Sequence, residues 1–196
     1  MLITHNMKNK KLLLGIAWAW LTCLSANAEV KLPAFFSDGM VMQQQTRANL
    51  WGTATPNAPV KITTSWDKQT YKTTADAKGA WKLALSTPSA GGPYTITFDD
   101  GKLTEIRDIL MGELWLCSGQ SNMEMPMKGF KNQPVENSNT DVMNSRNLQL
   151  RLFTVKRSSS FTPKTDVVGT WQEAVPATVR EFSATAYYFG RMIQQQ

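Results

Sequence analysis

The sequence places a serine on a glycine-flanked turn directly after an apolar run. The run covers residues 109–118, and the turn reads Gly119-Gln120-Ser121-Asn122-Met123. Hydrolases often hold a nucleophilic serine in this way, because a buried strand fixes the turn and the turn lifts the hydroxyl above the sheet edge. Ser121 is therefore the candidate catalytic nucleophile, and its backbone N–H is a candidate donor to the oxyanion of an acyl-transfer intermediate.

A base that would activate this serine is not found close to it in the sequence. A serine hydroxyl is a weak nucleophile unless a positioned base, usually a histidine, takes its proton. The only histidine of the chain is His5, near the N-terminus. The sequence thus supplies one half of a serine-hydrolase site.

Four neighbours of Ser121 are candidates for holding the turn. Gly119 has no side chain, which lets the backbone approach a substrate closely. Gln120 and Asn122 flank the serine and are expected to brace the loop. Glu124 is expected to hydrogen-bond the loop backbone, with a sugar hydroxyl as the alternative partner.

A second oxyanion donor is the backbone N–H of Ser183. This serine is expected to cap a helix whose apolar positions are spaced by four, three and four residues, at Phe182, Ala186, Phe189 and Ile193. The first amides of a helix have no partner within it, and the helix dipole favours an anion there. An ordinary helix cap without a catalytic role is the equal alternative.

The first 28 residues read as a secretory signal. Three lysines precede an apolar run over residues 12–24, and Ala26-Asn27-Ala28 is a cleavage site before Glu29. The apolar run is too short for a comfortable membrane span, so we expect an exported chain, periplasmic or extracellular, with no stable membrane insertion after cleavage. The alternative is a membrane anchor, or a lipid on Cys23.

The composition favours neither nucleic acid nor a cofactor as a partner. Without residues 1–28, which hold three Lys and no acidic residue, 18 basic residues face 15 acidic ones, a balance of +3. No run of Lys and Arg in this part exceeds two residues, which argues against a nucleic-acid surface. Neither a metal-ligand cluster nor a phosphate-binding glycine loop is visible, so we expect no metal and no cofactor.

Cys117 is the one cysteine left after signal removal, so the fold must stand without an internal disulfide. Because it sits within the apolar run, we expect a small buried hydrophobic residue there.

The first part of the exported chain is expected to be all-β. Apolar and polar residues alternate in several short segments, and turn residues lie between them, which is typical of a β-sandwich. The expected strands cover residues 59–66, 80–85 and 94–98. A structural role is the favoured interpretation of this module, with carbohydrate binding through Trp51 or Trp66 as the alternative.

The pattern changes from about residue 109. Leu114-Trp115-Leu116-Cys117 is expected to be a strand buried on both faces, and residues 148–155 form a second strand before the helix at Ser183. Strand, loop, strand, loop, helix is the opening of an α/β domain. Two strands and a helix cannot bury their apolar faces alone. We therefore interpret the sequence as a fragment, with a signal peptide over 1–28, a β-sandwich domain over 29–108 and the start of a catalytic domain over 109–196.

Three blocks of the sequence resemble the secreted sialate O-acetylesterases of the SGNH hydrolase superfamily. These blocks are residues 33–43 followed by Leu50-Trp51-Gly52, residues 112–126, and residues 182–191. The resemblance implies a three-layer α/β/α catalytic domain in which Ser121 attacks an acetyl carbonyl. It also implies an Asp-x-x-His block and a Gly-Glu-Asn-type block, neither of which lies within these 196 residues.

The resemblance implies a carbohydrate O-acetylesterase that removes acetyl groups from sialic acids through an acetyl-serine intermediate. The substrate would be an O-acetylated sugar or glycan, and this chain would be inactive alone because it lacks the Asp and His. An acetylxylan-type esterase and a non-catalytic carbohydrate-binding sandwich are the alternatives. Arg151 or Arg180 could pair with a sialic-acid carboxylate, although solvated surface charge is the favoured interpretation of both. No oligomeric state follows from the sequence.

Overall fold

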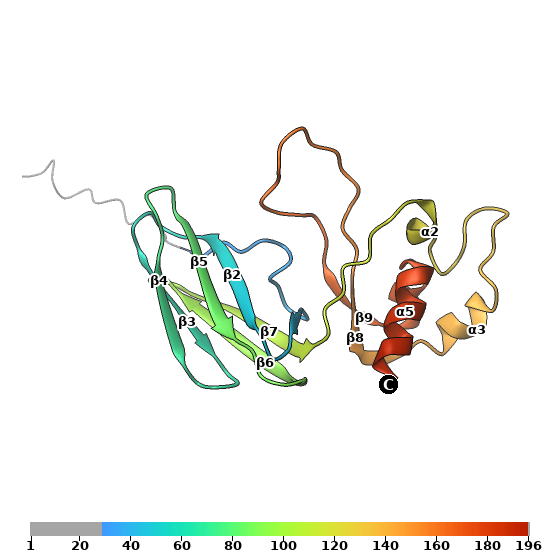
Figure 1. Ribbon diagram of the computed structural model, residues 1–196, viewed down its shortest axis with the longest axis horizontal. Helices are drawn as coiled ribbons and strands as arrows, with labels where there is room; N and C mark the ends of the chain where they lie inside the picture. The colour runs from blue at the N-terminus through green and yellow to red at the C-terminus, as the bar shows by residue number, and fades with distance from the viewer. Residues whose placement is uncertain (1–28, 196) are drawn as a thin grey trace, which may run out of the picture.

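The computed structural model describes residues 29–195, so the predicted signal peptide lies outside the described residues. Most of the regular structure is β, and a few short helices gather in the second half of the chain (Figure 1). Two separate apolar cores organise the chain, one within the strands of the first half and one beneath the helices.

The first half contains two sheets. The larger is mixed and has the strand order β1-β7-β6-β3-β4, in which only β1 and β7 are parallel. Its strands are β1 (Val41–Gln43), β3 (Pro59–Thr64), β4 (Thr70–Thr74), β6 (Gly91–Asp99) and β7 (Leu103–Gly112). The smaller sheet pairs β2 (Arg47–Thr53) with β5 (Ala80–Ser86) in antiparallel register.

The side chains between the two sheets form the larger core. Trp81 and Leu85 of β5 and Ile96 and Phe98 of β6 are each buried to 4% exposure or less. The rings of Trp81 and Phe98 lie 5.8 Å apart between centroids, so the two sheets are in direct contact. Each of the three strands expected from alternation is present, because every second residue along them faces this core.

Strand β7 continues to Gly112, past the domain boundary expected at residue 108. Ile109 and Met111 are the reason, since both are buried in the core between the sheets. The apolar run after residue 108 therefore belongs in its first part to the sandwich.

The prediction of a buried strand over Leu114–Cys117 is wrong for the described chain. Leu116 is 90% exposed and Trp115 is 56% exposed, and the segment forms no strand. A strand needs a hydrogen-bonding neighbour, and none of residues 29–195 pairs with this segment. Cys117 is exposed for the same reason, so the prediction that it is a buried hydrophobic residue is also wrong.

The second half contains a two-stranded antiparallel sheet and four short helices. The predicted strand over residues 148–155 is confirmed as β8 (Asn147–Phe153), and it pairs with β9 (Trp171–Ala174), which was not predicted. The helices are α2 (Ser121–Glu124), α3 (Ser138–Met143), α4 (Pro176–Val179) and α5 (Ala184–Gln194).

The second core lies beneath α5. Met127, Leu152, Val179 and Tyr187 are each buried to 3% exposure or less. Tyr187 is the main apolar contribution of α5, whereas Phe189 of the predicted stripe is 37% exposed. The apolar face of the helix is thus displaced from the predicted one.

An aromatic cluster joins β8 and β9 to the sandwich. The rings of Phe35, Phe153 and Trp171 lie 5.1–5.8 Å apart, and the Trp171 indole donates a 2.8 Å hydrogen bond to the carbonyl of Phe35. Beside this cluster, the side chain of Arg151 is 6% exposed and binds the carboxylate of Asp108. The expectation of solvated surface charge at Arg151 is therefore wrong, because the interface between the two halves covers it.

Candidate active site

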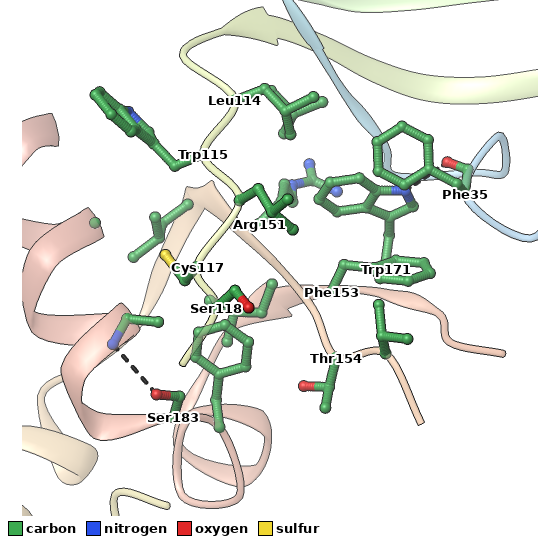
Figure 2. Close-up of a pocket in the computed structure, with 18 of the residues that line it drawn as sticks. Phe35, Leu114, Trp115, Cys117, Ser118, Arg151, Phe153, Thr154, Trp171 and Ser183 are labelled. Atoms are coloured by element: carbon green, nitrogen blue, oxygen red, sulfur yellow. Dashed lines mark hydrogen bonds between the residues drawn. The ribbon is translucent and has the colours of Figure 1, made fainter. Parts of the chain in front are cut away.

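A large open cleft of about 1760 Å³ lies between the sandwich and the second half of the chain. Its walls include the segment after β7, the start of α5 and the ends of β8 and β9. Figure 2 shows Leu114, Cys117 and Ser118 of that segment, and Ser183 at the start of α5, among the residues that line it. Ser121 lines the same cleft.

Ser121 stands exposed as the first residue of α2. The preceding carbonyl, that of Gln120, accepts hydrogen bonds from the amides of Met123 at 3.0 Å and Glu124 at 3.2 Å, and these bonds close the turn. Within residues 29–195, neither the hydroxyl nor the backbone N–H of Ser121 has a hydrogen-bond partner. Both groups are therefore free to meet a substrate in the cleft.

The chain after Ser121 is fixed to the start of α5. The amide of Met127 donates to the carbonyl of Phe182 at 2.9 Å, and the amide of Ala184 donates to the carbonyl of Met125 at 2.8 Å. The Thr185 hydroxyl adds a 3.1 Å hydrogen bond to the carbonyl of a residue within α2, Asn122. These contacts hold the serine turn and the first turn of α5 together.

Ser183 is confirmed as the cap of α5. Its hydroxyl accepts a 3.3 Å hydrogen bond from the amide of Ala186, which the dashed line in Figure 2 marks. Among the described residues, no acceptor is found for the backbone N–H of Ser183. Ser183 lines the same cleft as Ser121, and its role as a second oxyanion donor stays a prediction.

The contacts of the four expected loop supports, Gly119, Gln120, Asn122 and Glu124, are defined in the structure. A Cβ on Gly119 would lie 3.3 Å from the Cβ of Met123, so glycine relieves crowding within the turn. Gln120 and Asn122 hold the turn through their backbone carbonyls rather than through their side chains. Glu124 does not bind the loop backbone; its Oε1 accepts a 2.7 Å hydrogen bond from Nη1 of Arg157.

The other residues singled out in the sequence have different surroundings. Trp51 is 39% exposed and lines the cleft, in edge contact with Phe36 at 4.6 Å between ring centroids. Trp66 is half-buried and its indole donates to the carbonyl of Ser86 at 3.1 Å. Arg180 lies on the surface beside Glu181, at 3.2 Å.

The chain is similar in sequence and in structure to known proteins. No protein-family model matches the chain. The sialate O-acetylesterases of Pongo abelii and Homo sapiens are each 28% identical to it over 185 residues, which are 85% of this chain and 35% of those proteins. The sialate O-acetylesterase of Mus musculus is 28% identical over 187 residues, 86% of this chain and 34% of that protein.

A solved structure, that of a carbohydrate acetylesterase from Xanthomonas citri, superposes with a TM-score of 0.79. It is 33% identical, and the match covers 85% of this chain and 37% of that one. The chain therefore resembles the sialate O-acetylesterases over most of its length, as the three sequence blocks predicted. It spans about a third of the length of the relatives that it matches.

A hydrogen-bond network beside the cleft, formed by three side chains, was missed in the sequence. The side-chain amides of Gln43 and Gln44 donate to the carboxylate of Glu113 at 3.0 and 2.8 Å, and the amide of Leu114 donates to Oε1 of Gln43 at 2.9 Å. The amide donors, Gln44 foremost, lower the pKa of Glu113. This network anchors the segment that leads from the sandwich to Ser121.

A charged cluster outside the cleft holds helix α5. The Tyr188 hydroxyl donates to Asp141 at 2.7 Å, and Arg191 donates to its other oxygen at 2.9 Å. Burial, with the hydrogen bond to Asp141, raises the pKa of Tyr188 to about 12. The hydrogen bonds from Tyr188 and Arg191 lower the pKa of Asp141. The cluster fastens α3 to α5 and leaves the cleft untouched.

Residues 29–195 contain neither a metal-binding cluster nor a membrane-spanning helix. No group of three or more His, Cys, Asp or Glu side chains in that range is arranged to hold a metal ion. No helix in that range has the length and apolar character needed to cross a membrane. His5, the one histidine of the sequence, falls outside the described residues.

Proposed function

We propose that this chain is the N-terminal part of a carbohydrate O-acetylesterase in which Ser121 is the nucleophile. The observation that carries the proposal is the exposed Ser121, which lines the same cleft as Ser183 and whose hydroxyl and amide have no hydrogen-bond partner among the described residues. The sialate O-acetylesterase relatives and the carbohydrate acetylesterase structure support this chemistry.

The reaction would be an acyl transfer in two steps. Ser121 Oγ attacks the acetyl carbonyl carbon while a base takes the hydroxyl proton, and the C–O bond to the sugar breaks as that proton passes to the sugar oxygen. Water then attacks the acetyl-serine, which releases acetate and restores the hydroxyl. The backbone N–H groups of Ser121 and Ser183 would stabilise both oxyanions, at about 3–4 kcal/mol for a well-aligned donor.

The base and its orienting acid would come from protein beyond Gln196. This expectation follows from the family resemblance and agrees with relatives about three times as long as the matched segment. Trp115 of the exposed segment that leads to the serine turn contacts Phe189 of α5, at 5.1 Å between ring centroids.

Two substrate classes have support. The names of the curated relatives favour O-acetylated sialic acids. The solved structure is described more broadly as a carbohydrate acetylesterase, which leaves room for other acetylated glycans. Trp51 offers an aromatic ring at the sandwich wall of the cleft, on which a sugar of either class would stack.

The proposed enzyme would be exported. The lysines, apolar run and Ala26-Asn27-Ala28 site support cleavage after Ala28. N-terminal sequencing of the secreted protein should read Glu29-Val30-Lys31. A different start, or a lipid on Cys23, would contradict this part of the proposal.

The proposed function is tested by acetate release from O-acetylated N-acetylneuraminic acid and from acetylated xylan. The complete secreted protein is compared with its Ser121→Ala and Ser118→Ala variants, the second being a matched control that removes a nearby cleft hydroxyl. We expect Ser121→Ala alone to abolish release. Undiminished release by Ser121→Ala would defeat the proposal.

A further inference from the structure

The loop between β8 and β9 brings a guanidinium group to the serine turn. The amide of Lys156 donates to the carbonyl of Val168 at 2.7 Å and closes the neck of this loop, which rises between the two halves of the chain (Figure 1). Just beyond the neck, Nη1 of Arg157 binds Oε1 of Glu124 at 2.7 Å. Glu124 belongs to the same four-residue helix as Ser121, so Arg157 is held beside the nucleophile.

Arg157 keeps most of its hydrogen-bonding capacity for a ligand. A guanidinium has five N–H donors, and among residues 29–195 only the contact with Glu124 engages this one. Its side chain is 85% exposed, and the residue lines the cleft. The carboxylate of Glu124 therefore orients Arg157 from one edge and leaves other donors open to the cleft.

Each acidic side chain that lines the cleft already accepts hydrogen bonds from other residues of the described chain. Glu113 accepts from two glutamine amides, Glu124 accepts from Arg157, and Asp166 accepts from the backbone amides of Ala34 and Val167. The remaining acidic residue, Glu181, pairs with Lys128 and Arg180.

Two of the four basic side chains that line the cleft form no ion pair within the described residues. Arg151 is occupied by Asp108, but Lys156 and Lys164 have no carboxylate within ion-pair distance in the described part of the chain. Both lysines lie on the same loop as Arg157. The loop between β8 and β9 therefore brings three cationic side chains to the cleft, against one carboxylate of its own, Asp166.

We propose that Arg157, assisted by Lys156 and Lys164, binds the carboxylate of an acidic O-acetylated sugar. The planar guanidinium fits a carboxylate with two parallel hydrogen bonds, whereas the lysines add charge without a fixed geometry. This inference rests on the proposed function and names its substrate class, sugar acids rather than neutral sugars. It assigns to Arg157 the role that the sequence offered to Arg151 or Arg180.

The test is calorimetric binding of N-acetylneuraminic acid and of its methyl ester, which differ at the carboxylate. We expect the acid to bind the chain about three- to tenfold more tightly than the ester at low salt, and to lose this advantage as salt is added. Arg157→Gln should remove the preference, and Arg157→Lys should restore part of it. Arg180→Gln, an exposed arginine outside the cleft lining, should leave the preference unchanged.

Glucuronic acid and glucose form a second ligand pair, which separates a sialic-acid carboxylate from a uronic-acid carboxylate. Preference for either acid over its neutral partner, removed by Arg157→Gln, supports the inference. Equal affinity for acid and neutral partner in both pairs, no binding, or a preference that survives in Arg157→Gln would overturn it. No ester is cleaved in this assay, so its failure would leave the Ser121 chemistry to be decided by acetate release.

Discussion

The guanidinium of Arg151 donates two hydrogen bonds to the carboxylate of Asp108, at 2.6 and 3.1 Å, and so joins β8 to β7. Glu173 approaches the same guanidinium at 3.9 Å, and Arg151 also donates to the carbonyl of Leu148 at 3.0 Å. The pair lies beside the aromatic contact between Phe35 and Trp171. The ion pair between Arg151 and Asp108 and the cluster of aromatic side chains therefore hold the two walls of the cleft in a fixed arrangement.

Removal of Asp108 should destabilise the chain. Asp108→Ala leaves the guanidinium of Arg151, 6% exposed, without its main partner, and we expect a loss of about 1–3 kcal/mol in the free energy of unfolding. Urea denaturation measures it. Glu105→Ala, which breaks the exposed pair with Arg107, is the control and should leave the midpoint nearly unchanged. Equal effects of the two substitutions would show that the buried pair contributes no more to the free energy of unfolding than the exposed pair does.

Gly39 makes room for this pair. Its φ is +78°, and a Cβ there would lie 3.1 Å from Nη1 of Arg151. Gly39→Ala should therefore cost both backbone strain and a displacement of Arg151, more than 1 kcal/mol in all. Gly101→Ala is the matched control, because Gly101 also has a positive φ but no atom within 4 Å of the added Cβ. The idea fails if Gly101→Ala lowers the melting temperature as much as Gly39→Ala.

Ser183 has two proposed roles, an oxyanion donor through its backbone N–H and a helix cap through its hydroxyl, and one substitution tests them separately. Ser183→Ala removes the cap hydrogen bond to Ala186 and should cost about 1 kcal/mol of stability. The backbone N–H remains, so Ser121-dependent turnover by the complete protein should fall by a few-fold at most. A loss of turnover of about a hundredfold, in a variant that melts normally, would place the side chain rather than the amide in the chemistry.

The raised pKa of Tyr188 predicts that the folded chain loses stability at alkaline pH. Its pKa is about 12 in the folded chain, against 10 for a free phenol. Between these values the unfolded chain loses the proton and the folded chain keeps it, so stability falls as the pH rises from 10 to 12. We expect the difference in unfolding free energy between the wild type and Tyr188→Phe to shrink over this range. A constant difference would contradict the assignment.

The β-sandwich could be predicted from the sequence because the patterns that mark its strands and turns are local. Alternation in residues 80–85 and 94–98 and the turns between them depend on neighbours in the chain, and the cap at Ser183 depends on a residue three positions away. Strand β9 was missed because its four residues contain only Trp171 and Ala174 as apolar positions. Four residues are too few to show a period.

The interface and the cleft were less predictable, because their contacts join residues far apart in the sequence. Asp108 and Arg151 are separated by 43 positions, and Gln43 and Glu113 by 70. Nothing in the spacing of a single sequence marks such pairs. Leu114–Cys117 was misjudged for the opposite reason: its apolar composition indicates burial, but a strand also requires a pairing partner.

The central claim is that Ser121 is the residue acylated during catalysis. The most direct measurement treats the complete secreted protein with a fluorophosphonate probe and maps the modified peptide by mass spectrometry. We predict a single label on Ser121, absent from the Ser121→Ala variant and present in Ser118→Ala. A label on Ser118 or Ser183, or an undiminished label in Ser121→Ala, would contradict the account.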